Sequence, residues 1–262
     1  MKTDRREFLE LVGAVAGGVA LGARPALGGT SPKEVEAVGF DAFTLLDGRP
    51  VLAAAERLVP GRAMQLVETW RNRLFEYSWL RVAGRQYADF EAVSAEALAH
   101  ASDALHLNLS GEARHAFLEA TVQLPAWPES VSVLKQLSAT GRKLAFLSNF
   151  TPRMLASVSR SSGLEGLLDS LSTDAVRTYK PDPRAYQLAV DSFRVPRERI
   201  AFVANAGWDA AGGAWFGFPT FWINRTGAPR ESVASPAYTT LTSLVPLPGL
   251  LASGAGARAG SP

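Results

Sequence analysis

The chain has 262 residues, of which 47% are hydrophobic and 20% are charged. This composition allows one sizeable hydrophobic core and a small second domain, and it excludes a disordered protein. Basic and acidic residues number 27 and 25 without a block of like charge, so we expect no nucleic-acid partner. The absence of cysteine excludes thiol nucleophiles, cysteine metal sites and disulfides.

Residues 1–29 resemble a twin-arginine export signal. Arg5 and Arg6 precede an uncharged stretch of 13 residues, 11–23, that is rich in Gly, Ala and Val. This length fits the hydrophobic region of a signal peptide and falls short of the roughly 18 residues of a membrane-spanning helix. The small residues Ala26 and Gly28, on either side of Leu27, suit cleavage by signal peptidase. We expect recognition by the export machinery and a periplasmic or other extracytoplasmic location; the alternative is an arginine pair that begins an ordinary helix.

The next predicted elements are one strand and a run of helices. An apolar strand is expected at residues 35–41, and it delivers Asp41 at its carboxyl end. Helical spacing of hydrophobic residues then predicts helices at residues 53–59, 64–82, 90–105 and 111–122. Ser110 is the expected N-cap of the last helix. No strand pattern interrupts this stretch, which indicates a helical insertion.

From Pro125 onward, predicted helices alternate with predicted strands. The helices are expected at residues 129–140, 152–162, 183–193 and 209–216, and the strands at residues 144–147, near 170, 200–203 and 220–223. This alternation predicts a parallel sheet with right-handed crossovers.

The predicted fold class is therefore α/β, with a doubly wound parallel sheet and an inserted helical cap domain. The core domain is expected at residues 34–48 and 125–245, and the cap at residues 49–124. Residues 246–262 are rich in Gly, Ala and Ser and are expected to form a disordered tail.

Four polar groups follow predicted strands at their carboxyl ends or just beyond them. They are Asp41, Ser148-Asn149, Lys180-Pro181-Asp182 and Asp209. The carboxyl ends of parallel strands lie at one edge of the sheet, so these groups are expected to converge on one site. Each also has a structural explanation, because an aspartate often caps a helix and the other two patterns are common in turns and loops.

The sequence at these positions resembles the type II 2-haloacid dehalogenases of the haloacid dehalogenase superfamily. The resemblance runs from about residue 35 to residue 225. Its motifs are Phe40–Phe43, Trp70-Arg71 with Glu76–Arg81, Leu147–Asn149, Tyr179–Asp182 with Tyr186, and Gly207–Ala210 followed by Phe218–Thr220. It implies a Rossmann-like core, the helical cap and a homodimer.

The resemblance implies a covalent mechanism in which Asp41 attacks the halogen-bearing carbon of a small 2-haloacid and displaces halide. Water then hydrolyses the resulting ester. An aspartate is ionised at neutral pH without a helper base, and Lys180 is suited to hold it charged and oriented. By resemblance, Arg71 and Asn149 bind the departing halide beside Phe90.

The resemblance also assigns the substrate pocket. Ser148 and the backbone N–H groups that follow Asp41, at Ala42 and Phe43, would hold the substrate carboxylate. Tyr186 matches a tyrosine near the carboxylates. The apolar wall would contain Phe75, Phe90 and Trp208, and for each of these residues packing in the core is the alternative.

Phosphatases of the same superfamily use a second acid two residues after the nucleophile, together with magnesium. Position 43 is Phe, and the region of Asp209 offers only Asn205 beside it, which makes a poor magnesium site. The three histidines lie in predicted cap helices at spacings that share no helical face; they are His100, His106 and His115. We expect no metal and no cofactor.

Three departures from the family pattern affect ester hydrolysis. The segment after Phe43 is one residue shorter, which puts the role of Thr44 in question. Ala204 and Ala206 replace a Ser and an Asn that help to hold the nucleophile and the water, and Asn205 is offset by one position. We expect a slower ester hydrolysis or another substrate. The alternatives are a phosphatase-like or other hydrolase of the superfamily, and a non-catalytic exported binding protein on this scaffold.

Overall fold

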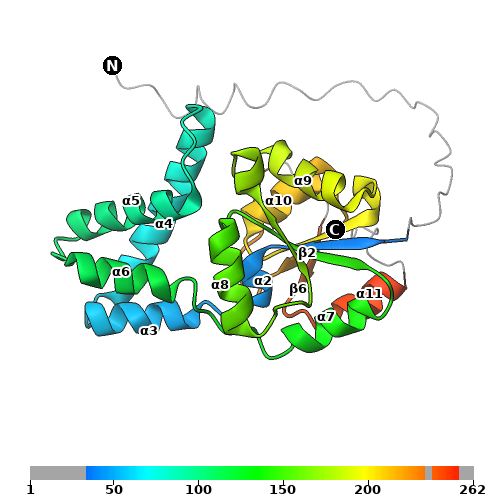
Figure 1. Ribbon diagram of the computed structural model, residues 1–262, viewed down its shortest axis with the longest axis horizontal. Helices are drawn as coiled ribbons and strands as arrows, with labels where there is room; N and C mark the ends of the chain where they lie inside the picture. Colours follow the sequence, from blue (N-terminus) through cyan, green and yellow to red (C-terminus); the bar gives the residue numbers. More distant parts are fainter. Residues whose placement is uncertain (1–33, 234–237, 254–262) are drawn as a thin grey trace, which may run out of the picture. The chain divides into compact units, whose positions relative to one another are not determined.

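The structure, a computed structural model, describes residues 34–233 and 238–253 (Figure 1). These residues contain a sheet of six parallel strands in the order β3-β2-β1-β4-β5-β6. The strands are β1 (Ala37–Phe40), β2 (Lys143–Ser148), β3 (Asp169–Ser172), β4 (Ile200–Ala204), β5 (Thr220–Ile223) and β6 (Thr239–Leu241). The predicted α/β fold class is confirmed, and β6 is an additional strand that the sequence pattern did not predict.

The export signal expected at residues 1–29 lies outside the described residues. Among the residues that are described, no helix combines the length and the hydrophobicity needed to cross a membrane.

Strand β1 lies at the centre of the sheet and determines where the site forms. All four of its residues are buried, and Phe40 pairs in register with Phe146 of β2 and Val203 of β4. The chain continues to β2 on one side of β1 and later reaches β4 on the other, so the strand order reverses there. Ligands of open α/β sheets bind at such a point, beyond the carboxyl ends of the strands. Asp41 follows β1 at this position.

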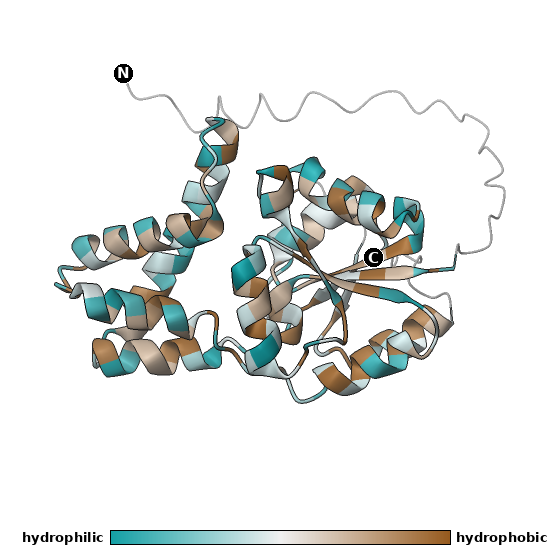
Figure 2. Cartoon of the chain, viewed as in Figure 1, coloured by the Kyte–Doolittle hydropathy of each residue, from teal (hydrophilic) through white to brown (hydrophobic). Residues whose placement is uncertain are grey.

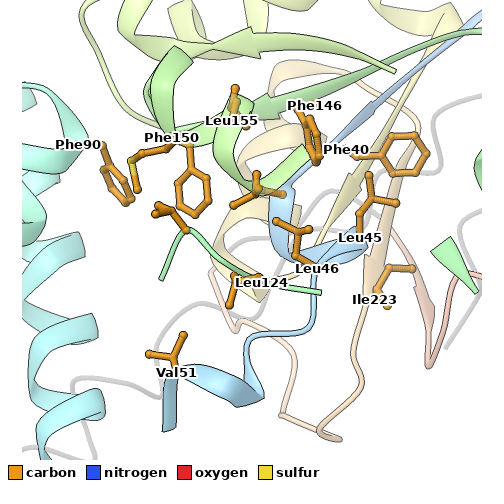
Figure 3. Close-up of a cluster of buried hydrophobic side chains, with 14 of the residues drawn as sticks. Phe40, Leu45, Leu46, Val51, Phe90, Leu124, Phe146, Phe150, Leu155 and Ile223 are labelled. Carbon is orange, nitrogen blue, oxygen red and sulfur yellow. The ribbon is translucent and has the colours of Figure 1, made fainter. Parts of the chain in front are cut away.

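Both faces of the sheet pack against hydrophobic clusters. Successive side chains of a strand point to opposite faces, so strands β1, β2, β4 and β5 each contribute to both clusters. Val38 and Phe40 join one hydrophobic cluster, whereas Ala37 joins a second cluster on the other face. Figure 3 shows part of the first cluster around Phe40 and Phe146. Strands β1, β2, β4 and β5 are rich in hydrophobic residues (Figure 2), as expected for strands buried on both faces.

Residues 49–120 contain only helices among their regular elements. After the short helix α2 (Ala42–Leu45) come α3 (Arg49–Leu58), α4 (Ala63–Ala83), α5 (Phe90–Ala104) and α6 (Gly111–Ala120). Ser110 caps α6 by accepting a hydrogen bond from the backbone N–H of Ala113, as predicted. These helices and the sheet fall within one compact unit, and the division into cap and core at residues 49 and 124 stays a prediction.

The remaining helices lie in the part of the chain that forms the sheet. They are α7 (Ser130–Ser138), α8 (Pro152–Ser162), α9 (Pro183–Phe193), α10 (Gly207–Phe216) and α11 (Leu247–Ala252), with 3₁₀ turns η1 (Thr173–Val176) and η2 (Arg197–Arg199). Helix α11 corrects the expected disordered tail over Leu247–Ala252, and residues 254–262 of that tail lie outside the described residues. Leu247 and Leu251 are one turn apart and are buried in the first cluster, on a helix that contacts α7. Apolar burial outweighs the Gly and Ala content of this segment.

Candidate active site

Asp41 links the end of β1 to the first turn of α2. Its Oδ1 accepts a hydrogen bond from Lys180 Nζ at 2.9 Å, and its Oδ2 accepts one from the backbone N–H of Phe43 at 3.1 Å. The side chain is 17% exposed, so the carboxylate is oriented and still accessible. Capping of α2 uses only one of the two oxygens, and the other faces the lysine.

Lys180 joins two carboxylates that are far apart in the sequence. Its side chain is 1% exposed, and Nζ lies 2.9 Å from Asp41 and 2.6 Å from Asp209 Oδ2. Burial opposes the charge of Lys180, but the two carboxylates outweigh burial and hold its pKa above the ordinary value for lysine. Lys180 is therefore a permanent cation at neutral pH.

Asp209, in the first turn of α10, is the more buried of the two acids. Its side chain is 1% exposed, and its Oδ1 accepts a hydrogen bond from the hydroxyl of Tyr186 at 2.8 Å. Burial raises the pKa of Asp209 to about 6, although Lys180 opposes the rise; Asp41 adds to it. Burial is the main cause, and the second carboxylate adds to it because one ammonium group must compensate both acids.

Tyr186 on α9 is fully enclosed beside Asp209. Burial and the neighbouring carboxylate hold the pKa of its hydroxyl well above the ordinary value, so it stays a donor. Gly212 makes this contact possible, because a Cβ at that position would lie 2.4 Å from the Tyr186 oxygen and 2.7 Å from Pro181 Cβ. Gly212 was not predicted to contribute to the site, because in the sequence it is only a glycine inside a helical pattern.

Ser148 and Asn149 follow at the end of β2, and both are buried. The Ser148 hydroxyl oxygen accepts a hydrogen bond from the backbone N–H of Phe150 at 3.1 Å, which leaves its own hydrogen available. Asn149 Oδ1 accepts from the backbone N–H of Lys180 at 2.9 Å and from Thr173 Oγ1 at 3.3 Å. No hydrogen bond among the described residues uses the Asn149 NH₂ group, so this group can donate to a ligand.

One set of aromatic rings connects α4 to the active site. The Phe75 and Trp79 rings on α4 pack against the ring of Trp208, with centroids 5.2 Å and 5.5 Å away. Trp79 also donates from Nε1 to the backbone oxygen of Lys180 at 3.2 Å. Phe75 and Trp208 were predicted wall residues, whereas the direct link of Trp79 to the lysine was not expected.

A second set of rings surrounds Phe150, which the sequence analysis did not single out. The Phe43 ring, next to the nucleophile, lies 5.6 Å from that of Phe150, and the Phe90 ring lies 5.9 Å from it. Phe90 and Phe150 are neighbours in Figure 3. The position of Phe150 directly after Ser148-Asn149 could have identified it as a residue of the site.

Ala42, a predicted substrate-binding residue, is buried at the start of α2.

Two predicted residues stand apart from the carboxylate cluster. Arg71 is exposed on α4, one turn before Phe75, and makes no hydrogen bond or ion pair within the part of the chain that the structure describes. Its role at the halide stays a prediction. Thr44 is buried, and its hydroxyl donates to the backbone oxygen of Asp41 at 2.6 Å, so it supports the nucleophile loop instead of contacting the carboxylate.

The end of β4 and the segment after it carry Ala204 and Ala206, whose side chains cannot form hydrogen bonds with Asp41 or a water. Ala204 is buried at the end of β4, and Ala206 precedes α10 without a side-chain cap. Asn205 between them is exposed, consistent with the opposite direction expected for an extended segment. Within residues 34–233 and 238–253, no group of three or more acidic or histidine side chains is placed to hold a metal ion.

A parallel sheet whose central strand ends in a lysine-paired aspartate fits one family of hydrolases. Residues 35–217 match the family model described as haloacid dehalogenase-like hydrolase. This match covers more than half of the 262 residues, and the chain belongs to this family.

Individual relatives are similar over most of their length. The chain is 36% identical to (S)-2-haloacid dehalogenase of Pseudomonas sp. (strain YL), over 80% of this chain and 91% of that protein. It is 39% identical to (S)-2-haloacid dehalogenase 4A of Burkholderia cepacia, over 81% and 93%. The structure of L-2-haloacid dehalogenase from Xanthobacter autotrophicus with chloropropionic acid covalently bound has a TM-score of 0.77 at 32% identity, covering 83% of this chain and 98% of that one.

Proposed function

We propose that the chain is a 2-haloacid dehalogenase. The observation that carries this proposal is the accessible Asp41 carboxylate, held by Lys180 on one oxygen and by a backbone N–H on the other. A carboxylate in this setting can attack the carbon that bears the halogen. The carbon–halogen bond breaks, its electron pair leaves with the halide, and an ester forms on Asp41.

The substrate groups fit donors around Asp41. The Ser148 hydroxyl and the backbone N–H of Ala42 would bind the substrate carboxylate. The backbone N–H of Phe43 donates to Asp41 Oδ2 and would have to turn away from it to join them. The NH₂ group of Asn149 would stabilise the departing halide, since its oxygen is already occupied. Arg71 would join it from α4 once substrate is bound. The rings of Phe75, Phe90 and Trp208 would exclude water from the reacting carbon.

Ester hydrolysis requires a base that removes a proton from water. Asp209 fits this role because its raised pKa, about 6, makes it a better proton acceptor than an ordinary aspartate. Water attacks the ester carbonyl, the hydroxyacid is released, and Asp41 is regenerated as a carboxylate. We expect this half to be the slower one, since Ala204 and Ala206 offer the water no hydrogen bond from their side chains.

The test is release of halide from 2-chloropropionate and bromoacetate, with Asp41→Asn as the control variant. We expect chloride or bromide release from the unmodified enzyme and none from the variant. A mass increase on the Asp41 peptide during turnover would identify the ester directly. Absence of release from every haloacid would favour a binding protein, and magnesium-stimulated cleavage of a phosphate ester would favour the phosphatase branch.

Two further proposals rest on the sequence and on the family resemblance. We propose export through the twin-arginine signal at residues 1–29 to a place outside the cytoplasm, and assembly as a homodimer. Replacement of both Arg5 and Arg6 by Lys should retain the protein in the cytoplasm, as measured by cell fractionation. Light scattering of the purified protein tests the dimer, and a monomer at micromolar concentration would contradict it.

A further inference from the structure

A cavity of about 760 Å³ is lined by four arginines and lies outside the carboxylate cluster. Arg81 and Arg85 come from the end of α4 and the residues after it. Arg177 follows η1, and Arg184 belongs to the first turn of α9. Four guanidinium groups from two distant parts of the sequence thus meet in one concave space.

The positive charge of this cavity is only partly compensated. Arg81 pairs with Glu96 at 2.7 Å, and Arg184 pairs with Asp182 at 2.6 Å. Arg85 and Arg177 have no carboxylate partner in the described part of the chain, and Arg177 lies over the Tyr87 ring at 5.0 Å. Asp174 lies nearby and accepts a hydrogen bond from the Tyr87 hydroxyl, but it makes no ion pair with Arg85 or Arg177. Guanidinium groups without an ion pair in a concave site are available to bind a negatively charged ligand.

The backbone holds the same two residues in an uncommon conformation. Arg85 has φ of 55° and Arg177 has φ of 49°, in the left-handed region that costs free energy for a residue with a Cβ. Both residues end helices: Arg177 is the C-cap of η1 and its backbone N–H donates to Asp174, and the backbone N–H of Arg85 donates to Val82 directly after α4. The left-handed conformation is a common helix ending. The conformation fixes where each long side chain leaves the backbone at the rim of the cavity.

The cavity adjoins a second one that is lined in part by active-site residues. It shares Val82 and Asp182 with a more apolar cavity of about 560 Å³, which is lined by Trp79 and Trp208. Trp79 is the residue that donates to the backbone oxygen of Lys180. A ligand among the arginines would therefore touch both α4 and the segment that carries the active-site lysine.

We propose that this cavity is a second binding site, separate from Asp41, for an organic anion with two or more carboxylate or phosphate groups. Planar guanidinium groups match the oxygen pairs of these anions and bind them with two parallel hydrogen bonds. Arg85 and Arg177 supply two guanidinium groups that have no ion pair among the described residues, and the volume is that of a small-molecule site. The proposal does not depend on the reaction at Asp41.

Binding is measured by calorimetry on the full chain with two probes, citrate for carboxylates and pyrophosphate for phosphates. We expect saturable binding of at least one probe, and the tighter one assigns the class. The double variant Arg85→Gln/Arg177→Gln should weaken that binding at least tenfold. Arg194→Gln is the matched control, since Arg194 is also exposed and left-handed, with φ of 55°, but does not line the cavity.

Two further measurements separate this site from the nucleophile. Binding should persist in Asp41→Asn and should weaken as the salt concentration rises. The proposal is overturned if neither probe binds, if the double variant binds as tightly as the unmodified chain, or if Ser148→Ala abolishes binding while the arginine variant does not.

Discussion

Asp41 and Asp209 bind the same ammonium group but lie in different surroundings. Asp41 is 17% exposed and receives a backbone N–H as its second donor, whereas Asp209 is 1% exposed and receives a tyrosine hydroxyl. Burial raises the pKa of Asp209 to about 6. Two residues of the same type thus differ in function because of their surroundings: Asp41 is an accessible nucleophile and Asp209 is a buried proton acceptor.

The largest expected effect is at Asp41. Asp41→Asn keeps an oxygen that can accept from Phe43 but removes the nucleophilic charge, so turnover should fall by roughly a thousandfold or more. Halide release measures the loss, and an unchanged circular dichroism spectrum verifies the fold. Retained activity would mean that Asp41 and Asp209 have been assigned the wrong roles.

Removal of the shared cation tests whether both acids depend on it. Lys180→Met leaves two carboxylates without compensation, and the free energy of unfolding at pH 8 should fall by about 3–5 kcal/mol. The fall should be smaller at pH 5, where Asp209 takes up a proton. Urea unfolding at the two pH values measures this difference. The control is the exposed Lys135→Met, which should change stability by less than about 0.5 kcal/mol.

The pH dependence separates the two halves of the reaction. Asp209 accepts a proton only when ionised, so ester hydrolysis should slow by about tenfold per pH unit below the pKa of Asp209. In the ester this pKa should lie below its value of about 6 in the free enzyme, because esterification removes the Asp41 charge that adds to the rise. The initial burst of halide, which reports attack by Asp41, should not follow the same inflection. Rapid-quench kinetics between pH 4.5 and 8 would measure both steps. An identical profile in Asp209→Asn would contradict the assignment of the base.

The raised pKa of Asp209 also determines how this residue changes the free energy of unfolding with pH. The folded state holds the Asp209 proton more tightly than the unfolded chain, because the pKa rises from 3.8 to about 6. The contribution of this group to the free energy of unfolding therefore decreases as the pH rises through this range, and it is least favourable above pH ~6. Other carboxylates paired with arginine act in the opposite direction, so the effect is measured as a difference between the unmodified chain and Asp209→Asn.

The smallest expected effect is at Tyr186. Tyr186→Phe removes one hydrogen bond to Asp209 and should lower the free energy of unfolding by about 1 kcal/mol. The ionised form of Asp209 loses a donor, so the inflection in ester hydrolysis should move to higher pH. A shift to lower pH would show that the hydroxyl does not stabilise the carboxylate. Tyr77→Phe, on α4, is a matched control that should leave the inflection unchanged.

Much of the site was predictable because strand ends are local features. Asp41, Ser148 and Asp209 each lie at or after the end of an apolar run. These runs predicted strands, so the three residues were expected near one edge of the sheet. Trp79, Phe150 and Gly212 were missed as contributors, because their contacts join residues far apart in the chain. Helix α11 was not predicted, because the Gly, Ala and Ser content of residues 246–262 was given more weight than Leu247 and Leu251, which are at helical spacing.

The sequence by itself determined the chain order of strands β1 to β5 and of the main helices between them, the parallel sheet and the polar residues at its carboxyl edge. Hydrophobic periodicity and short motifs encode these properties within a few residues. Only the tertiary structure decided that one lysine serves two acids, that Asp209 is the desolvated one, and that four arginines surround a cavity. Charge compensation and desolvation depend on distances between groups that folding brings together from positions as far apart as 41, 180 and 209.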